Sequence, residues 1–476
     1  MSGCHWSLAR EDSRVLKLVL REAFFKVFIF CKDMEIIVWI CTISVVCIIA
    51  GVIFYKPYLG VAFVIVSIPF EGKIDFGFIS IYPLEAILAI FVLICIYKSI
   101  VGRYNFFGNT KLVYSCIPFV LCIMLSAIKS IELSSTAKEI VRWLELFLIY
   151  YLTINLINDE KKLRIILYSM FLTVAVVSIL GIINYLNMGH RAISFFGNPN
   201  PLAGYVNLII PVLFGMLMSS VFLWERITLG VFTVLSIGTW FLTFSRSGWL
   251  SLIITIIFLL FLNKIKRRAI FISLIVFSIF VVIVLFTNIK YDLLKRSEPG
   301  QVLSSIGSRI KCYSIGSYIV KDDLIFGIGT GNYHLLIKKF AENATVIYHP
   351  IPNLLIKRFT ENATTMHIGT RELIVKSNLH SLYLQIFVET GFMGLSAFAF
   401  WLVCMVKYLM SSLKTLENTR DYSFLVGLMG GVIVYLFNNL TEVLTVHGIH
   451  LQWGIILGLA VVLIQSREYK ECLRKV

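Results

Sequence analysis

Long apolar runs alternate with short polar loops along most of the chain. A helix of about 20 apolar residues crosses the hydrocarbon core of a bilayer, so each run of about that length predicts one membrane helix. One apolar run, at 57–70, is short and bounded by prolines, and we expect a half-span or a re-entrant piece there. Clear spans are predicted at residues 36–54, 80–97, 113–128, 138–157, 165–187, 201–222, 228–245, 249–263, 269–287, 386–409, 424–443 and 451–464. This pattern predicts an all-α polytopic membrane protein of about twelve transmembrane helices.

Lysine and arginine in the loops set the expected orientation, because cytoplasmic loops of membrane proteins collect positive charge. The basic segments alternate with the predicted spans in a way that places both ends of the chain in the cytoplasm. These segments are residues 98–111, 159–164, 264–268, 407–420 and 467–475. The long polar segment between the ninth and tenth clear spans then lies on the outer face.

The expected organisation has five parts, separated where the hydropathy changes. They are an N-terminal cytoplasmic or interfacial segment, the first ten apolar runs (57–70 included), one large outer loop, the last spans and a cytoplasmic tail. Their bounds are 1–35, 36–287, 288–385, 386–464 and 465–476.

The outer loop contains a tandem repeat at residues 335–364. The sequence from Leu335 to Thr345 recurs from Leu354 to Thr364, a shift of 19 residues. Two copies are too few for a solenoid, which needs at least about three. A local duplication that lengthens an amphipathic helix of the loop is the simpler interpretation.

Composition supports placement in a bilayer and removes several classes of function. Hydrophobic residues are 58% of the chain and charged residues 15%. The net charge of +16 comes mainly from short basic clusters between apolar runs, without the basic and aromatic groove that binds nucleic acid. The ten cysteines have no spacing typical of a zinc site. We therefore expect no nucleic-acid partner and no metal.

Two arginines lie at short turns on the outer face. Arg191 begins a turn in which Asn198 and Asn200 can bind a polar ligand, and prolines and a glycine enforce the turn. Arg246 lies at the tip of a Ser-Arg-Ser-Gly hairpin between two spans, where a guanidinium needs an anionic partner such as phosphate. Both arginines could instead simply extend to lipid headgroups. For Arg246 the functional interpretation is favoured.

The large outer loop adds an arginine, a glycine-rich run and a histidine. Arg309 precedes a run from Phe326 to Tyr333, whose glycines Gly327, Gly329 and Gly331 could cradle a phosphate, although the run lacks the lysine of a P-loop. Arg309 alone would be a solvated loop charge. His380 lies where the loop re-enters the membrane and can exchange a proton near pH 7. Gly391 and Gly394 follow and would let the next helix pack closely. Two further acidic residues, Glu389 and Glu442, are candidate buried carboxylates without an assigned role.

These pieces, in this order, resemble the O-antigen ligase and polymerase family of bacterial envelope enzymes, over roughly residues 80 to 465. The most specific element is His380-Ser381, then nine residues, Gly391, two residues and Gly394, which is similar to the signature of the ligases. The stretch from Arg191 to Asn200, the Ser-Arg-Ser-Gly turn and the run from Phe326 to Tyr333 resemble other characteristic stretches of the family.

The resemblance implies a C-type membrane glycosyltransferase of the bacterial inner membrane, with its large loop in the periplasm. Such enzymes transfer a glycan from undecaprenyl pyrophosphate to a sugar hydroxyl of lipid A–core, without a metal, a nucleotide sugar or another cofactor. By the same resemblance Arg246, Arg309 and His380 carry the reaction. The arginines would hold the pyrophosphate, and His380 would orient or deprotonate the acceptor hydroxyl. The 19-residue duplication between Arg309 and His380 departs from the family and bears on the acceptor side.

Two other functions remain open. A polysaccharide polymerase would use the same donor and join lipid-linked repeat units to each other. A transporter of small solutes is more distant, because carriers place polar groups at the bilayer midplane. Here the candidate groups gather at the outer face instead.

Overall fold

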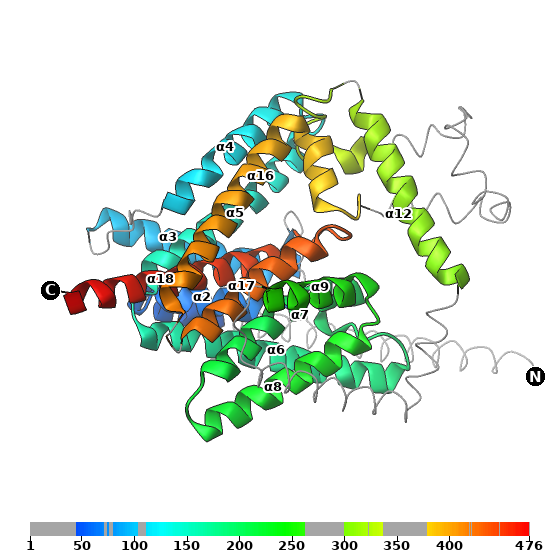
Figure 1. Cartoon of the computed structure of the whole chain (residues 1–476). Coiled ribbons are helices and arrows are strands. Elements are labelled where there is room, and N and C mark those ends of the chain that lie inside the picture. Colours follow the sequence, from blue (N-terminus) through cyan, green and yellow to red (C-terminus); the bar gives the residue numbers. More distant parts are fainter. Residues whose placement is uncertain are drawn as a thin grey trace, which may run out of the picture.

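The computed structural model describes residues 44–70, 74–75, 80–102, 111–261, 299–321, 323–336, 378–417, 419, 421–446 and 448–475. These residues form a helical bundle with one short antiparallel ladder, in which β1 (Ile74–Asp75) pairs with β2 (Ser80–Ile81). Figure 1 shows the arrangement of the helices. They are α2 (Tyr58–Ser67), α3 (Pro83–Ile100), α4 (Lys111–Ser126), η1 (Ala127–Lys129), α5 (Leu133–Leu156), α6 (Glu160–Met188), η2 (Ser194–Phe196), α7 (Pro199–Ser219), α8 (Leu223–Leu242), α9 (Arg246–Phe261), α12 (Pro299–Val320), α16 (Leu382–Leu416), α17 (Asp421–Asn438) and α18 (Ile449–Lys475).

The helical, membrane-spanning character predicted from hydropathy is confirmed. Within the described residues, eight helices are long and apolar enough to cross a bilayer, and three shorter apolar helices accompany them at Ser44–Tyr55, Tyr58–Ser67 and Arg246–Leu259. The doubtful run at 57–70 contains only the 10-residue helix α2. The full count of twelve and the location of the large loop stay predictions. The predicted segment 1–35, the span 269–287 and nearly all of the tandem repeat lie outside the described residues.

Several helices begin at residues other than those predicted, and in two of them a serine hydroxyl caps the earlier start. The Ser245 hydroxyl accepts from the amide of Gly248 at 3.4 Å, so α9 begins at Arg246 rather than at residue 249. The Ser381 hydroxyl accepts from the amide of Leu384 at 3.4 Å, so α16 begins at Leu382 rather than at residue 386. Both shifts place a candidate catalytic residue directly at the start of a helix.

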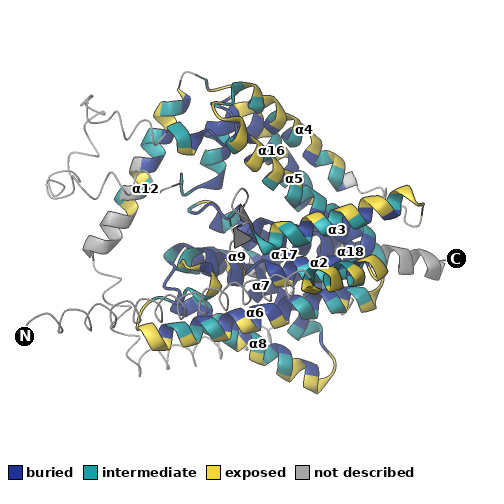
Figure 2. Cartoon of the chain, turned by 180° about the vertical axis from the view of Figure 1, so that it is seen from behind, coloured by how far each residue is buried: buried dark blue, intermediate teal, exposed yellow. Residues whose placement is uncertain are grey.

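Three helices form the centre of the bundle. In the most apolar stretch of each helix, the share of residues buried inside the protein is 89% for α18, 78% for α7 and 72% for α17. The corresponding share is 22% for α3. Figure 2 shows the same division, with buried residues over α7, α17 and α18 and exposed ones over α4 and α8. Gly215 of α7 and Gly427 of α17 let the two backbones meet, since a Cβ on Gly215 would lie 2.7 Å from the Gly427 Cα. The loop that follows α17 is thereby held against the beginning of α7.

Helix α16 is broken near its start. Gly391 has φ 67° and ψ −166°, which is not helical, and a Cβ there would overlap the carbonyl oxygen of Ile325. The break is filled by residues 324–329. The amides of Ile328 and Gly329 donate to the carbonyls of Val388 and Glu389 at 3.0 and 2.9 Å, and those of Phe392 and Met393 donate to Leu324 and Ile325 at 2.8 and 3.2 Å. Gly391 thus permits close approach by a loop, whereas the sequence predicted close approach by a neighbouring helix.

Candidate functional site

The carboxylate of Glu442, in the loop after α17, is the centre of a polar cluster. Its Oε1 atom accepts from Arg309 Nη2 at 2.8 Å, from Asn200 Nδ2 at 3.0 Å and from Ser247 Oγ at 3.4 Å. Its Oε2 atom lies 3.5 Å from Nδ1 of His380. The four partners come from α7, α9, α12 and the residue pair before α16, so segments up to 242 positions apart in the chain meet at one carboxylate.

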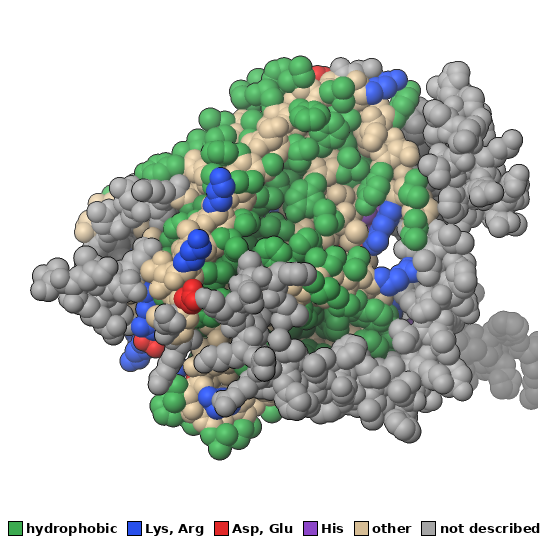
Figure 3. All heavy atoms as spheres, in the orientation of Figure 1, with side chains coloured by type: hydrophobic (Ala, Val, Ile, Leu, Met, Phe, Trp, Pro, Cys, Tyr) green, Lys and Arg blue, Asp and Glu red, His purple; other side chains and the backbone are tan. Residues whose placement is uncertain are grey.

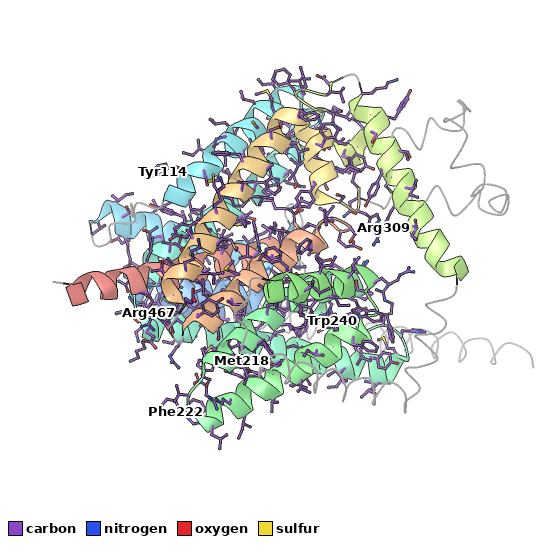
Figure 4. The ribbon with its side chains drawn as sticks, viewed as in Figure 1. Tyr114, Met218, Phe222, Trp240, Arg309 and Arg467 are labelled. Atoms are coloured by element: carbon purple, nitrogen blue, oxygen red, sulfur yellow. The ribbon has the colours of Figure 1, made fainter. Side chains whose placement is uncertain are left out.

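Arg309 and Glu442 form a partly shielded ion pair. Their side chains are 24% and 10% exposed, so the pair is screened less than a surface pair would be. Figure 4 shows Arg309 projecting from α12 toward the rest of the molecule. Figure 3 shows Lys and Arg side chains gathered with a histidine at the same edge of an otherwise apolar face. The arrangement is a positively charged edge with one buried counter-charge.

His380 is held by its backbone while its ring remains available. It has φ 50°, an uncommon backbone conformation for a residue with a side chain. Its amide donates to Asn378 Oδ1, and its carbonyl accepts from the Tyr313 hydroxyl, both at 3.3 Å. Burial raises the pKa of Tyr313, which keeps this hydroxyl a donor. Nδ1 of the ring is buried and has no hydrogen-bond partner among the described residues.

Arg246 begins α9 and is half-buried. It forms no hydrogen bond or ion pair within the part of the chain that the structure describes. Its neighbour Ser247 donates to Glu442, so the guanidinium is attached to the backbone beside the polar cluster. The amino end of a helix adds a partial positive charge to that of the side chain. Among the described residues no carboxylate neutralises Arg246, so its guanidinium can serve an anionic ligand.

Arg191 is tied to the cluster through Asn200. Its Nη2 donates to Asn200 Oδ1 at 2.9 Å, and its Nε donates to the carbonyl of Thr243 at 2.7 Å. Asn200 thus bridges Arg191 and Glu442. Asn198 has a different role, because its side chain accepts from the amide of Asn200 at 2.9 Å and caps α7.

Comparison with known families finds a match, over the middle part of the chain. Residues 231–399 match the family model described as O-antigen ligase. This segment is an O-antigen ligase domain. The match includes Arg246, Arg309 and His380, and it confirms the resemblance found in the sequence. No curated protein matches the chain. The matched segment therefore supports a membrane glycan enzyme of the O-antigen ligase and polymerase type.

The glycine-rich run of the O-antigen ligase domain has a structural role here. Gly327, Gly329 and Gly331 all have positive φ, at 70°, 97° and 75°. The amide of Gly327 donates to Asp323 O at 2.8 Å, that of Gly329 to Glu389 O, and that of Gly331 to the Glu389 carboxylate. These amides join the loop to the break in α16. In this structure the amides of the three glycines donate to protein acceptors. Substrate binding by these glycines stays a prediction.

Glu442 lies outside the matched segment, and the sequence assigned it no role. The only signal was a carboxylate at the end of an apolar run, where a charged group is costly unless it has partners. Sequence patterns do not show which residues those partners are. The other buried carboxylate, Glu389, contacts the glycine-rich loop and Gln385 rather than Arg246 or Arg309. Among the described residues no group of three or more His, Cys, Asp and Glu side chains could hold a metal ion.

Proposed function

We propose that the protein transfers a glycan from undecaprenyl pyrophosphate to a sugar hydroxyl of lipid A–core, at the periplasmic face of the bacterial inner membrane. The observation that carries the proposal is the convergence of Arg309, Ser247 with its neighbour Arg246, and His380 on one carboxylate. Two cations beside one imidazole suit a reaction in which a pyrophosphate leaves and a hydroxyl attacks.

The arginines would bind the pyrophosphate. A guanidinium offers parallel N–H donors that match two phosphate oxygens, and it stays charged at any physiological pH. As the bond between the anomeric carbon and the phosphate oxygen breaks, its electron pair moves to the pyrophosphate. Arg246 and Arg309 would stabilise this developing charge in a site partly shielded from water.

His380 would act on the acceptor. The acceptor hydroxyl gives its proton to the imidazole while its oxygen bonds to the anomeric carbon, so one bond forms as the other breaks. A base positioned in this way is worth about 10²–10⁴-fold in rate. The lipid tail of the donor would lie against the apolar surface of the helices. Because the pyrophosphate is already a good leaving group, the proposed reaction uses neither a nucleotide sugar nor a metal.

A polymerase is the alternative within the same family. The cluster around Glu442 would serve a hydroxyl of a second lipid-linked repeat unit as well as one of lipid A–core. The distinction therefore depends on the acceptor and is made by the product. A small-solute transporter is disfavoured, since Arg246, His380 and Glu442 lie at or just beyond the ends of α9, α16 and α17 rather than at the middles of these helices.

The direct test is transfer by purified protein in proteoliposomes. Lipid-linked O-antigen is supplied with lipid A–core, and the products are separated on a gel. We expect long chains attached to lipid A–core, and we expect His380→Ala to reduce transfer about 10²–10⁴-fold while inserting normally. Longer lipid-linked chains without attachment would indicate a polymerase. Wild-type activity in a well-expressed His380→Ala protein would contradict the catalytic assignment.

A further inference from the structure

Glu442 is bonded to a guanidinium that the proposed donor would need. Arg309 is one of two arginines proposed to hold the pyrophosphate, yet its Nη2 donates to Glu442 at 2.8 Å. A pyrophosphate carries more negative charge than one carboxylate and offers several oxygens to a guanidinium. Binding of the donor therefore has to replace the Arg309–Glu442 contact, at least in part.

The released carboxylate has a ready second partner. Nδ1 of His380 is buried, lies 3.5 Å from Glu442 Oε2 and has no hydrogen-bond partner among the described residues. A buried ring nitrogen without a partner is unfavourable, so a carboxylate that turns toward it stabilises the pair. A good hydrogen bond of this type is about 2.8 Å long, so the required movement is less than about 1 Å.

Two neutral donors provide the pivot for this movement. Asn200 Nδ2 and Ser247 Oγ both donate to Oε1, at 3.0 and 3.4 Å, and neither is a charged group that pyrophosphate would attract away. They can hold Oε1 while Oε2 approaches the ring. Asn200 is itself held by Arg191, which fixes the position of the pivot.

We propose that Glu442 is a positioning residue that exchanges partners: it neutralises Arg309 in the free enzyme and pairs with His380 when the pyrophosphate of the donor occupies Arg309. This inference rests on the proposed function. The exchange places the proton of the imidazole on Nδ1, facing Glu442, and leaves Nε2 with a free lone pair for the acceptor hydroxyl. His380 therefore becomes an effective base only after the donor has bound. The consequence is an ordered reaction, in which the acceptor is not deprotonated at an empty site.

The test separates binding from turnover in Glu442→Gln. The amide cannot neutralise Arg309, so binding of undecaprenyl pyrophosphate should become tighter, roughly fivefold to tenfold. The amide also cannot hold the imidazolium, so the single-turnover rate at saturating donor should fall about 10²-fold or more. Glu442→Asp keeps the charge and should restore part of the rate while binding the lipid close to the wild-type affinity.

The matched control is Glu145→Gln. Glu145 Oε2 lies 3.8 Å from Nε2 of His450, so it is another carboxylate beside a buried histidine, outside the polar cluster. It should change neither binding nor rate. A purely structural role for Glu442 would weaken binding and slow transfer together in Glu442→Gln, with no rescue by aspartate. That result would overturn the exchange.

A measurement on the unsubstituted protein covers the case in which Glu442→Gln fails to fold. With ¹⁵N-labelled histidine, and His380→Asn used for assignment, the Nδ1 resonance of His380 should move to that of a hydrogen-bonded N–H when undecaprenyl pyrophosphate is added. An unchanged resonance in protein that binds the lipid would contradict the exchange and leave the proposed function standing. Failure of the wild-type protein to bind the lipid, or binding unaffected by Arg246→Ala, would instead contradict the proposed function itself.

Discussion

The hydroxyl of Tyr313 in α12 donates a hydrogen bond to the backbone carbonyl of His380, 67 positions further along the chain, at 3.3 Å. This contact joins the helix that carries Arg309 to the residue proposed as the base. Tyr313 lies one turn after Arg309 on the same helix, so this contact helps to fix the position of Arg309 relative to His380.

Removal of that hydroxyl should slow transfer without weakening donor binding. Tyr313→Phe loses one hydrogen bond, worth about 1 kcal/mol net, and we expect a decrease of up to about tenfold in kcat with KM for the donor unchanged. The pKa of Tyr313 is raised by burial, so the folded protein holds this proton more tightly than the unfolded chain. The bond's contribution to stability is therefore present below about pH 10 and is lost as pH rises further. Steady-state kinetics and thermal unfolding in detergent at pH 8 and pH 11 measure both effects.

Replacement of Arg246 and of Arg309 should have different effects on the stability of the protein, although both arginines are needed for activity. Arg246→Ala removes a side chain without a hydrogen bond or ion pair in the described structure, so we expect lost transfer with unfolding unchanged to within about 0.5 kcal/mol. Arg309→Ala leaves Glu442 without its charged partner, so we expect lost transfer and destabilisation of about 1–3 kcal/mol. Equal stability of the two variants would show that the Arg309–Glu442 pair contributes nothing to folding.

Asn198 and Asn200 lie two positions apart, but their replacement should affect transfer differently. Asn200→Ala breaks the link between Arg191 and Glu442 and should reduce transfer, since the carboxylate loses a donor at 3.0 Å. Asn198→Ala removes only the cap of α7, which costs about 1 kcal/mol and should leave transfer near the wild-type level. Activity at matched protein levels, compared with the unfolding midpoints, distinguishes the two. A larger loss of transfer in Asn198→Ala would refute this assignment of roles.

Alanine at the break in α16 should disrupt the loop at residues 324–329, which fills the break. Gly391 has φ 67°, and its added Cβ would overlap Ile325 O, so we expect Gly391→Ala to cost about 2–4 kcal/mol and to abolish transfer. Gly230 in α8 is the control, because a Cβ there meets nothing within 4 Å. Gly230→Ala should be neutral or slightly stabilising. Limited proteolysis of the two variants should show increased cleavage near residues 324–329 only in Gly391→Ala.

Much of the fold and part of the site could be predicted from the sequence. Apolar runs of the right length locate most helices, because hydrocarbon thickness imposes their length. Arg246 and His380 are prominent in short local patterns, whereas Arg309 becomes a candidate only through the family resemblance. The structure brings Arg309, His380 and the neighbour of Arg246 to one point. The break at Gly391 was not predicted, since it depends on backbone donors from residues 324–329 rather than on the local sequence of α16.

Glu442 and the glycine-rich run show why the rest could not be predicted. The local sequence around Glu442 does not indicate that Asn200 and Arg309 are its partners. These contacts depend on how the helices pack, for example on the close approach of Gly215 to Gly427. The positive φ values of Gly327, Gly329 and Gly331 agree with a run of glycines. A glycine-rich sequence gives backbone freedom, but it does not specify whether a phosphate or a protein carbonyl accepts from the freed amides.

Both edges of the segment between Leu336 and Asn378 are anchored to the same small apolar cluster, formed by Val320, Tyr333, Leu379 and Val388. Because its ends are already fixed side by side, lengthening the chain between them adds only the slowly growing entropy of a longer closed loop, about 0.6 kcal/mol for each doubling. Nineteen extra residues can therefore be gained there without displacing His380. The positions of Arg309 and His380 therefore depend on this apolar cluster rather than on the number of residues between its two edges.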